Sequence, residues 1–337
     1  KLDDDALLLG LIDAELAGAQ AYSQGGELAQ QRAKALDYYM GRQKHELVGV
    51  EGRSKVVSTD VADTIEWIMP SLLRVFAAGD ETVRFEPQGP EDEEAAKQAT
   101  DYVNWIFNRD NPGFLILYTL FKDALLQKNG IGKVWYEEAE RTIETPLLGP
   151  DGQPLLEKIT KEEAEFRRGQ LAENETLQMH EPDEHTGLMS GTILRKVKLG
   201  RVRVAAVPPE EFLISRWARS LADSPFTCHR TPRTKSSLIA DGYDREQVMG
   251  LPSREHIEDW NEETTARRQF DEESFVASHS EEMALVWADE CYIQADQDGD
   301  GIAELRRVMV AGKQILRRNG KPDNEVWETG APPFFSL

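Results

Sequence analysis

Residues 114–138 read FLILYTLFKDALLQKNGIGKVWYEE, and the spacing of the apolar residues changes within this stretch. Over 114–127 apolar residues lie on most sides of a helix, which predicts a helix at the centre of the core. Asn129-Gly130 ends it. Over 131–138 the residues alternate well enough for a strand. The chain is therefore expected to change from helices to strands at Gly130.

The residues before this stretch predict further helices. Asp60 is placed to cap one that runs to Gly79 with a kink at Pro70. Pro90 and the four acidic residues after it favour another helix N-terminus, since the helix dipole attracts negative charge there. The remaining two helices are indicated by a stripe of Leu7, Leu8, Leu11, Ile12 and Leu16 and by the segment Ala33–Tyr39.

The residues after Gly130 predict strands and a surface insertion. Arg195–Val207 and Glu210–Ile214 alternate like strands and are expected to join 131–138 in one sheet packed on the 114–127 helix. Residues 139–190 are polar and rich in glutamate, with a helix expected at Lys161–Leu171, so about 139–190 is interpreted as a surface insertion.

A second, smaller unit is expected towards residue 337. Lys235–Val248 predicts a short helix, and Met283–Ala295, Ala303–Val310 and Lys313–Arg318 predict three antiparallel strands. The fold class is thus α+β, with a helical domain and a mixed or antiparallel sheet over 1–230 and a β-rich unit over 231–337.

Composition limits the kinds of function. The 337 residues are 40% hydrophobic and 30% charged, as expected of a folded protein and not of a membrane protein. The densest apolar run, 114–121, is well short of the roughly 20 residues that span a bilayer. No export signal is visible at Lys1, so synthesis in the cytoplasm is expected. A net charge of −22 disfavours a broad grip on nucleic acid but not nucleic acid that slides past.

The segment Asp296-Gln297-Asp298-Gly299-Asp300-Gly301-Ile302-Ala303-Glu304 is the motif most suggestive of chemistry. Asp296, Asp298, Asp300 and Glu304 could supply oxygens to calcium or magnesium, as in the first half of an EF-hand loop. Arg307 stands where that loop has its bidentate glutamate. A hairpin turn without metal explains the same Asp and Gly residues, so both interpretations stay open, and no cofactor is required.

Signs of catalysis are few. The chain has no phosphate-binding loop, nucleophile elbow or HExxH motif. A nuclease would have to use carboxylates such as Asp289 and Glu290 together with those of the Asp-rich turn. The sequence therefore does not indicate an enzyme.

Several segments together resemble the portal proteins of tailed bacteriophages, in particular the long podovirus type. They cover most of the chain and occur in the order of that family: Tyr38-Tyr39-Met40-Gly41, Arg53-Ser54-Lys55-Val56-Val57, Pro70-Ser71-Leu72-Leu73, Phe85-Glu86-Pro87 with the acidic helix 91–108, Lys122–Leu126 through Asn129–Val134, Val207–Phe212, Ala288–Tyr292 with the Asp296–Glu304 turn, and Pro332-Pro333-Phe334.

The resemblance implies a structural protein of the virion, present in the host cytoplasm during assembly. It implies a dodecameric ring at one capsid vertex, whose channel passes double-stranded DNA during packaging and ejection. The implied partners are other copies of the chain, terminase, tail or adaptor proteins, and the major capsid and scaffolding proteins, with no membrane. Residues 1–230 would form the wing-like domain and 231–337 the stem or clip-like unit, with tunnel helices following residue 337.

Two alternatives from other classes remain. A metal-dependent nuclease would use Asp296, Asp298 and Glu304, and would require magnesium-dependent cleavage. A calcium-stabilised scaffold protein would require calcium-dependent melting.

Overall fold

A computed structural model describes residues 4–23, 27–42, 58–77, 79, 81–146, 171, 175–179, 191–253, 262–268, 280–297 and 299–337. The chain divides into two compact units, of which unit 1 comprises 1–134 and 204–337 and unit 2 comprises 135–203. Helices and antiparallel sheets are both present, so the predicted α+β class is confirmed.

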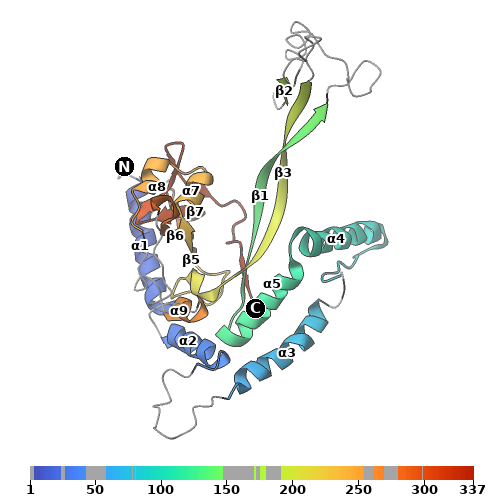
Figure 1. Ribbon diagram of the computed structural model, residues 1–337, viewed down its shortest axis with the longest axis vertical. Coiled ribbons are helices and arrows are strands. Elements are labelled where there is room, and N and C mark those ends of the chain that lie inside the picture. The colour runs from blue at the N-terminus through green and yellow to red at the C-terminus, as the bar shows by residue number, and fades with distance from the viewer. Residues whose placement is uncertain are drawn as a thin grey trace. The chain divides into compact units, whose positions relative to one another are not determined.

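Unit 1 contains a six-stranded antiparallel sheet (Figure 1). The strands follow the order β11-β7-β6-β5-β4, and β8 pairs with β7. Their bounds are β4 Phe212–Ile214, β5 Phe226–Thr234, β6 Leu285–Ala295, β7 Glu304–Ala311, β8 Gln314–Ile315 and β11 Asn324–Val326, with a separate pair of β9 Arg317–Arg318 and β10 Lys321–Pro322.

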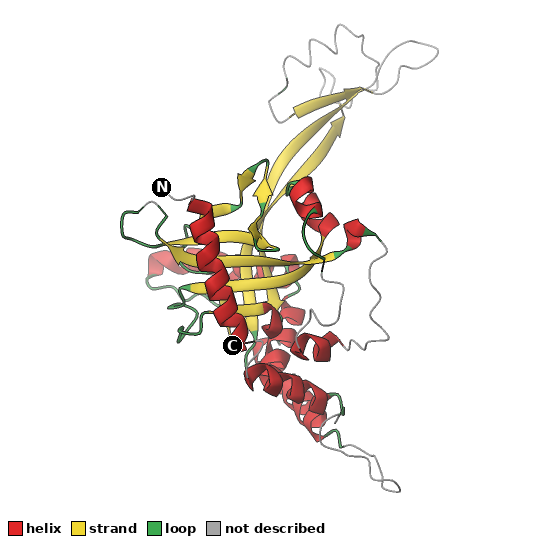
Figure 2. Ribbon diagram, turned by 90° about the vertical axis from the view of Figure 1, so that its left-hand side faces the viewer, coloured by secondary structure: helices red, strands yellow, loops and turns green. Residues whose placement is uncertain are grey.

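Alternating residues of this sheet pack against different helices. Cys291 and Ile293 of β6 belong to a core with Leu8 and Ile12 of α1 (Asp4–Ser23), and Figure 2 shows α1 lying across the sheet. Val286 of β6 points to the other face of the sheet, where it packs with other strand residues against α7 (Lys235–Ala240) and α8 (Arg245–Met249). Because side chains of a strand alternate between its faces, one sheet serves both cores.

Three helices form a further core of unit 1. They are α2 (Glu27–Tyr39), α3 (Asp60–Phe76) and α5 (Gly113–Gln127), and they bury Leu36, Ile65, Met69, Phe121 and Leu126 together. The Phe76 and Phe121 rings lie 5.2 Å apart between centroids. A short helix, α9 (Glu262–Arg268), packs on α2.

The four strands of the other sheet follow the order β12-β1-β3-β2. β1 (Ile131–Pro146) and β3 (Gly191–Val207) run from unit 1 into unit 2, where β3 pairs with β2 (Glu175–Met179). In unit 1, β12 (Phe334–Ser336) pairs with the start of β1, so that Phe334 lies opposite Lys133. The Phe334 ring packs in a T-shaped arrangement with the rings of Phe212 and Tyr292, and the ring centroids lie 5.0 and 5.6 Å apart.

The structure corrects several details of the sequence analysis. The strand at Phe212–Ile214 belongs to the six-stranded sheet and not with β1 and β3. The helix expected over Lys235–Val248 is two helices, because Gly242 takes a positive φ of 91° between them. Residue 230, the expected domain boundary, lies inside β5, which pairs with β4 and β6 on its two sides.

The α5 helix is less buried than its apolar sequence suggests. Phe114 and Leu115 are 52% and 60% exposed, while Ile116 and Leu120 are buried. The predicted helix at Lys161–Leu171 and most of the expected insertion lie outside the described residues.

Candidate functional site

The Asp-rich turn joins β6 to β7, as the antiparallel pattern predicted. The Asp296 carboxylate accepts hydrogen bonds from the backbone N–H groups of Gly299 (2.7 Å) and Gly301 (2.9 Å). The Asp300 carboxylate accepts one from Ile302 N at 2.7 Å. Both glycines have positive φ, 84° and 88°, which side chains rarely adopt. These contacts are those of a tight turn.

The other proposed ligands do not meet at this turn among the described residues. Glu304 Oε2 lies 3.3 Å from Arg306 Nη1 and so faces a guanidinium. Asp298 lies outside the described residues. Within the part of the chain that the structure describes, no group of three or more acidic, histidine or cysteine side chains is placed to hold a metal. Metal binding at Asp296, Asp298, Asp300 and Glu304 stays a prediction.

The carboxylates of Asp289 and Glu290 are each held by cations. Asp289 accepts from Arg230 Nε and Nη2 at 2.6 and 2.8 Å, whereas Glu290 pairs with Lys133 and accepts from Arg307 Nε at 2.8 Å. Burial by itself raises a carboxyl pKa, but Lys133 and Arg307 outweigh it and lower the pKa of Glu290 to about 2. Since neighbouring residues of a strand point to opposite faces, these two carboxylates do not converge.

A second set of buried charges, which we call the α9 ion cluster, was not visible in the sequence. Arg267 Nη2 donates to Asp123 Oδ1 of α5 at 2.7 Å, and Arg267 Nε lies 2.8 Å from Glu210 Oε1. Glu263 Oε2 lies 3.7 Å from Arg32 Nη1 of α2. The cluster comprises Arg32, Asp123, Glu210, Glu263 and Arg267, and it fastens α9 to α2 and α5.

The helix α3 exposes several large apolar side chains among its polar ones, and nothing in the described part of the subunit covers them. Trp67 is 85% exposed and Val75 is 74% exposed, next to a buried face that carries Ile65 and Met69. Exposed clusters of large apolar side chains commonly mark sites of protein association. We therefore regard this helical part of unit 1 as an assembly surface.

The helix α4 (Glu93–Trp105) is held to the segment 81–87 by polar contacts. Asn104 Oδ1 accepts from Thr82 N (2.7 Å) and Val83 N (3.0 Å), and Asn104 Nδ2 donates to Val83 O at 2.7 Å. Thr100 Oγ1 accepts from Phe85 N at 3.0 Å. No residue of α4 belongs to a hydrophobic core cluster among the described residues. The large aromatic residues of α4, Tyr102 and Trp105, are 64% and 54% exposed.

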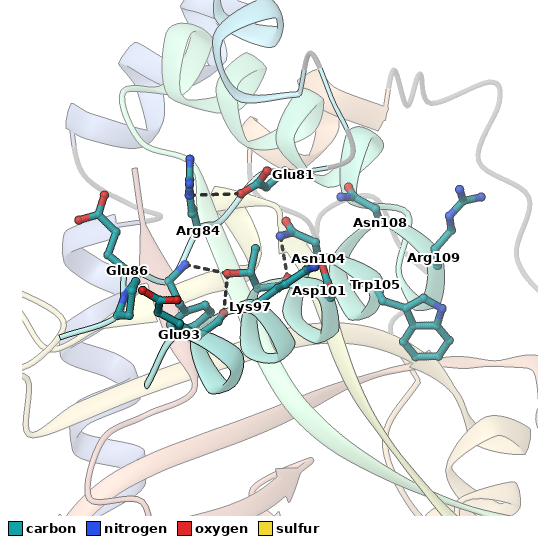
Figure 3. Close-up of a pocket in the computed structure, with 14 residues that line it drawn as sticks. Glu81, Arg84, Glu86, Glu93, Lys97, Asp101, Asn104, Trp105, Asn108 and Arg109 are labelled. Atoms are coloured by element: carbon teal, nitrogen blue, oxygen red, sulfur yellow. Dashed lines mark hydrogen bonds and ion pairs between the residues drawn. The ribbon is translucent and has the colours of Figure 1, made fainter. Parts of the chain in front are cut away.

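An open groove, which we call the α4 groove, lies between α4 and the segment 81–87 (Figure 3). Its volume is about 890 Å³. Phe85 and Trp105 line it and are 44% and 54% exposed. Its charged residues are Glu81, Arg84, Glu86, Glu93, Lys97, Asp101 and Arg109. Aromatic residues and arginine are enriched at protein interfaces, and the groove offers both, together with carboxylates.

No helix in the described ranges has both the length and the apolar character that crossing a bilayer would require. A search of curated proteins found no match. The family model described as Phage SU10 portal protein matches residues 8–337, which is nearly the whole chain. Because the match covers nearly the whole chain, the chain belongs to the Phage SU10 portal protein family.

Proposed function

We propose that the chain is one subunit of a closed ring of about twelve copies, the number that the portal resemblance implies. Assemblies of identical subunits mostly adopt closed point groups, which supports a closed ring. The ring would sit at one vertex of the capsid and surround the channel for DNA packaging and ejection. The observation that carries the proposal is the match of the portal family model to residues 8–337. The exposed apolar side chains of α3 and α4 support it, since such surfaces are covered in assemblies.

The negative charge of the chain suits a channel that does not bind the DNA passing through it. With 61 acidic and 39 basic residues, a subunit repels phosphates on average. DNA that is repelled by the ring can slide through it, whereas a basic channel would release counterions and bind.

The ring would have several protein partners. It would dock the terminase during packaging, and tail or adaptor proteins afterwards, and it would meet the major capsid and scaffolding proteins in the host cytoplasm during assembly. The family is structural, so the packaging energy would come from a separate motor. Calcium or magnesium at the Asp-rich turn would be optional and not catalytic.

The mass and symmetry of the full-length protein test this proposal. Light scattering should give a mass near twelve subunits, and negative-stain micrographs should show rings. A mass of only one or two subunits at micromolar concentration would contradict the proposal. Magnesium-dependent DNA cleavage that Asp298→Asn abolishes would favour the nuclease instead.

A further inference from the structure

Residues 215–223, in the loop between β4 and β5, expose a tryptophan between two arginines. Trp217 is 76% exposed, and the Arg216 guanidinium lies 4.9 Å from the centre of its ring. Arg219 is also exposed. Among the described residues no carboxylate pairs with either arginine. We call this segment the Trp217 loop.

The Trp217 loop is held in one conformation by its own hydrogen bonds. Asp223 Oδ1 accepts from Arg219 N (3.2 Å), Ser220 N (2.7 Å) and Ser220 Oγ (3.0 Å). Leu221 packs, partly buried, on the core formed around Tyr292. An exposed tryptophan on a fixed loop loses little conformational entropy when it binds, so the loop is preorganised for a partner.

The α4 groove has complementary properties. Glu86, Glu93 and Asp101 line it and form no ion pair with any described residue. Figure 3 shows Glu86 and Glu93 at one end of the groove, and Trp105 and Arg109 at the other. Phe85 and Pro87 line the groove as well. Arg84, Lys97 and Arg109 line the groove too, and Arg84 pairs with Glu81. The carboxylates of Glu86 and Glu93 can therefore receive the two arginines, and Phe85 and Pro87 offer apolar surface for an aromatic ring.

We infer that the Trp217 loop of one subunit docks in the α4 groove of a second copy, at the end that carries Glu86 and Glu93. This inference rests on the proposed ring and names a contact that would build it. Tryptophan and arginine are the side chains that most often dominate protein interfaces. Pairing the two arginines with the groove carboxylates would also favour the correct register between subunits of net charge −22.

The positions of the two surfaces favour a contact between subunits over one within a subunit. Both belong to unit 1, and Figure 1 shows α4 on one side of α5 and the loop between β4 and β5 on the other. A contact between two different surfaces of identical subunits is heterologous, and it closes into a ring when the rotation allows.

Charge reversal tests the contact. The loop variant Arg216→Glu/Arg219→Glu and the groove variant Glu86→Arg/Glu93→Arg should each fail to form the ring, as measured by light scattering. Mixing the two variants should restore the ring, because each reversed surface then meets its complement in alternating subunits. Trp217→Ala should raise the subunit concentration at which the ring dissociates by about tenfold or more.

A matched control for the loop variant is Arg317→Glu/Lys321→Glu, which likewise replaces two cations by two carboxylates, at exposed positions of β9 and β10. It should leave the ring intact. The inference is overturned if the wild-type chain forms rings and the loop variant does so equally well, or if the mixture stays dissociated. A wild-type protein that forms no ring would refute the proposed function, and with it this contact, before any variant is compared.

Discussion

Replacing Glu263 by glutamine is expected to stabilise the protein at pH 8 and to have little effect near pH 4.5. The Glu263 side chain has no solvent exposure, and its charged neighbour Arg32 lies 3.7 Å away. Burial raises the pKa of Glu263 from 4.5 to about 7, with Glu210 adding to the rise while Arg32 and Arg267 oppose it. Between pH 4.5 and about 7 the folded state therefore holds a proton that the unfolded chain has lost.

The size of the effect follows from the shift in pKa. Because the folded pKa lies above the unfolded value, the carboxyl destabilises the fold progressively as the pH rises from 4.5 to about 7, and by a constant amount above that. One pKa unit corresponds to 1.36 kcal/mol, so the ionised Glu263 carboxylate destabilises the folded state by about 3 kcal/mol. Glutamine removes the charge and keeps the shape. Arg32 stays satisfied, because it also donates to Gln127 O at 3.1 Å and to Asn129 Oδ1 at 2.6 Å.

Urea unfolding at pH 5, 6, 7 and 8, at one protein concentration, measures this. The difference in unfolding free energy between Glu263→Gln and the wild type should grow with pH and level off near pH 8. Glu328→Gln, at an exposed position in the loop before β12, serves as the control and should give no difference. A difference that does not change between pH 5 and 8, or a glutamine variant that is less stable at pH 8, would refute the reasoning.

Three further predictions concern other parts of the chain. Asn104→Ala removes the contacts to Thr82 and Val83, so amide hydrogen exchange at both positions should speed up by at least about tenfold, and unchanged exchange would contradict the role given to Asn104. Gly130→Ala should destabilise by roughly 2 kcal/mol or more in urea unfolding, since a Cβ there would lie 2.2 Å from Leu120 O, whereas Gly10→Ala, with no atom within 4 Å, should stabilise by about 0.5–1 kcal/mol. Calorimetric titration with calcium should show binding at the Asp-rich turn no tighter than about 10⁻⁴ M. The four proposed carboxylates and one backbone carbonyl would give about five protein oxygens, fewer than the 6–8 that calcium prefers. Micromolar affinity that is lost in Asp300→Ala would show instead that the metal is structural.

Local patterns predicted the elements because their causes are local. The change of period at Gly130 separated α5 from β1, and the acidic run after Pro90 preceded α4. The Asp-rich segment could be interpreted as a turn because Asp and Gly favour turns wherever they occur, while metal binding there stayed open.

The same reasoning could not predict contacts between residues that are far apart in the sequence. Asp123 and Arg267 are 144 residues apart, and no spacing rule relates them. A buried arginine such as Arg32 looks like any surface cation in a sequence that is 30% charged. The strand at Phe212–Ile214 was assigned to the wrong sheet for the same reason, because which strands share a sheet depends on pairing and periodicity shows only that a strand exists.

The pairing of β12 with β1 has a consequence for how the chain folds during synthesis. Ile131 pairs with Ser336. The edge of β1 at residues 131–133 therefore has no partner strand until residues about 200 positions further along the chain have left the ribosome. Contacts this remote in sequence form slowly, because a long loop must close before they are made. During that time the start of β1 is an open strand edge, which is a template for pairing with another chain. Residues 131–133 of nascent subunits on neighbouring ribosomes are therefore open to wrong pairing until Phe334 joins the sheet.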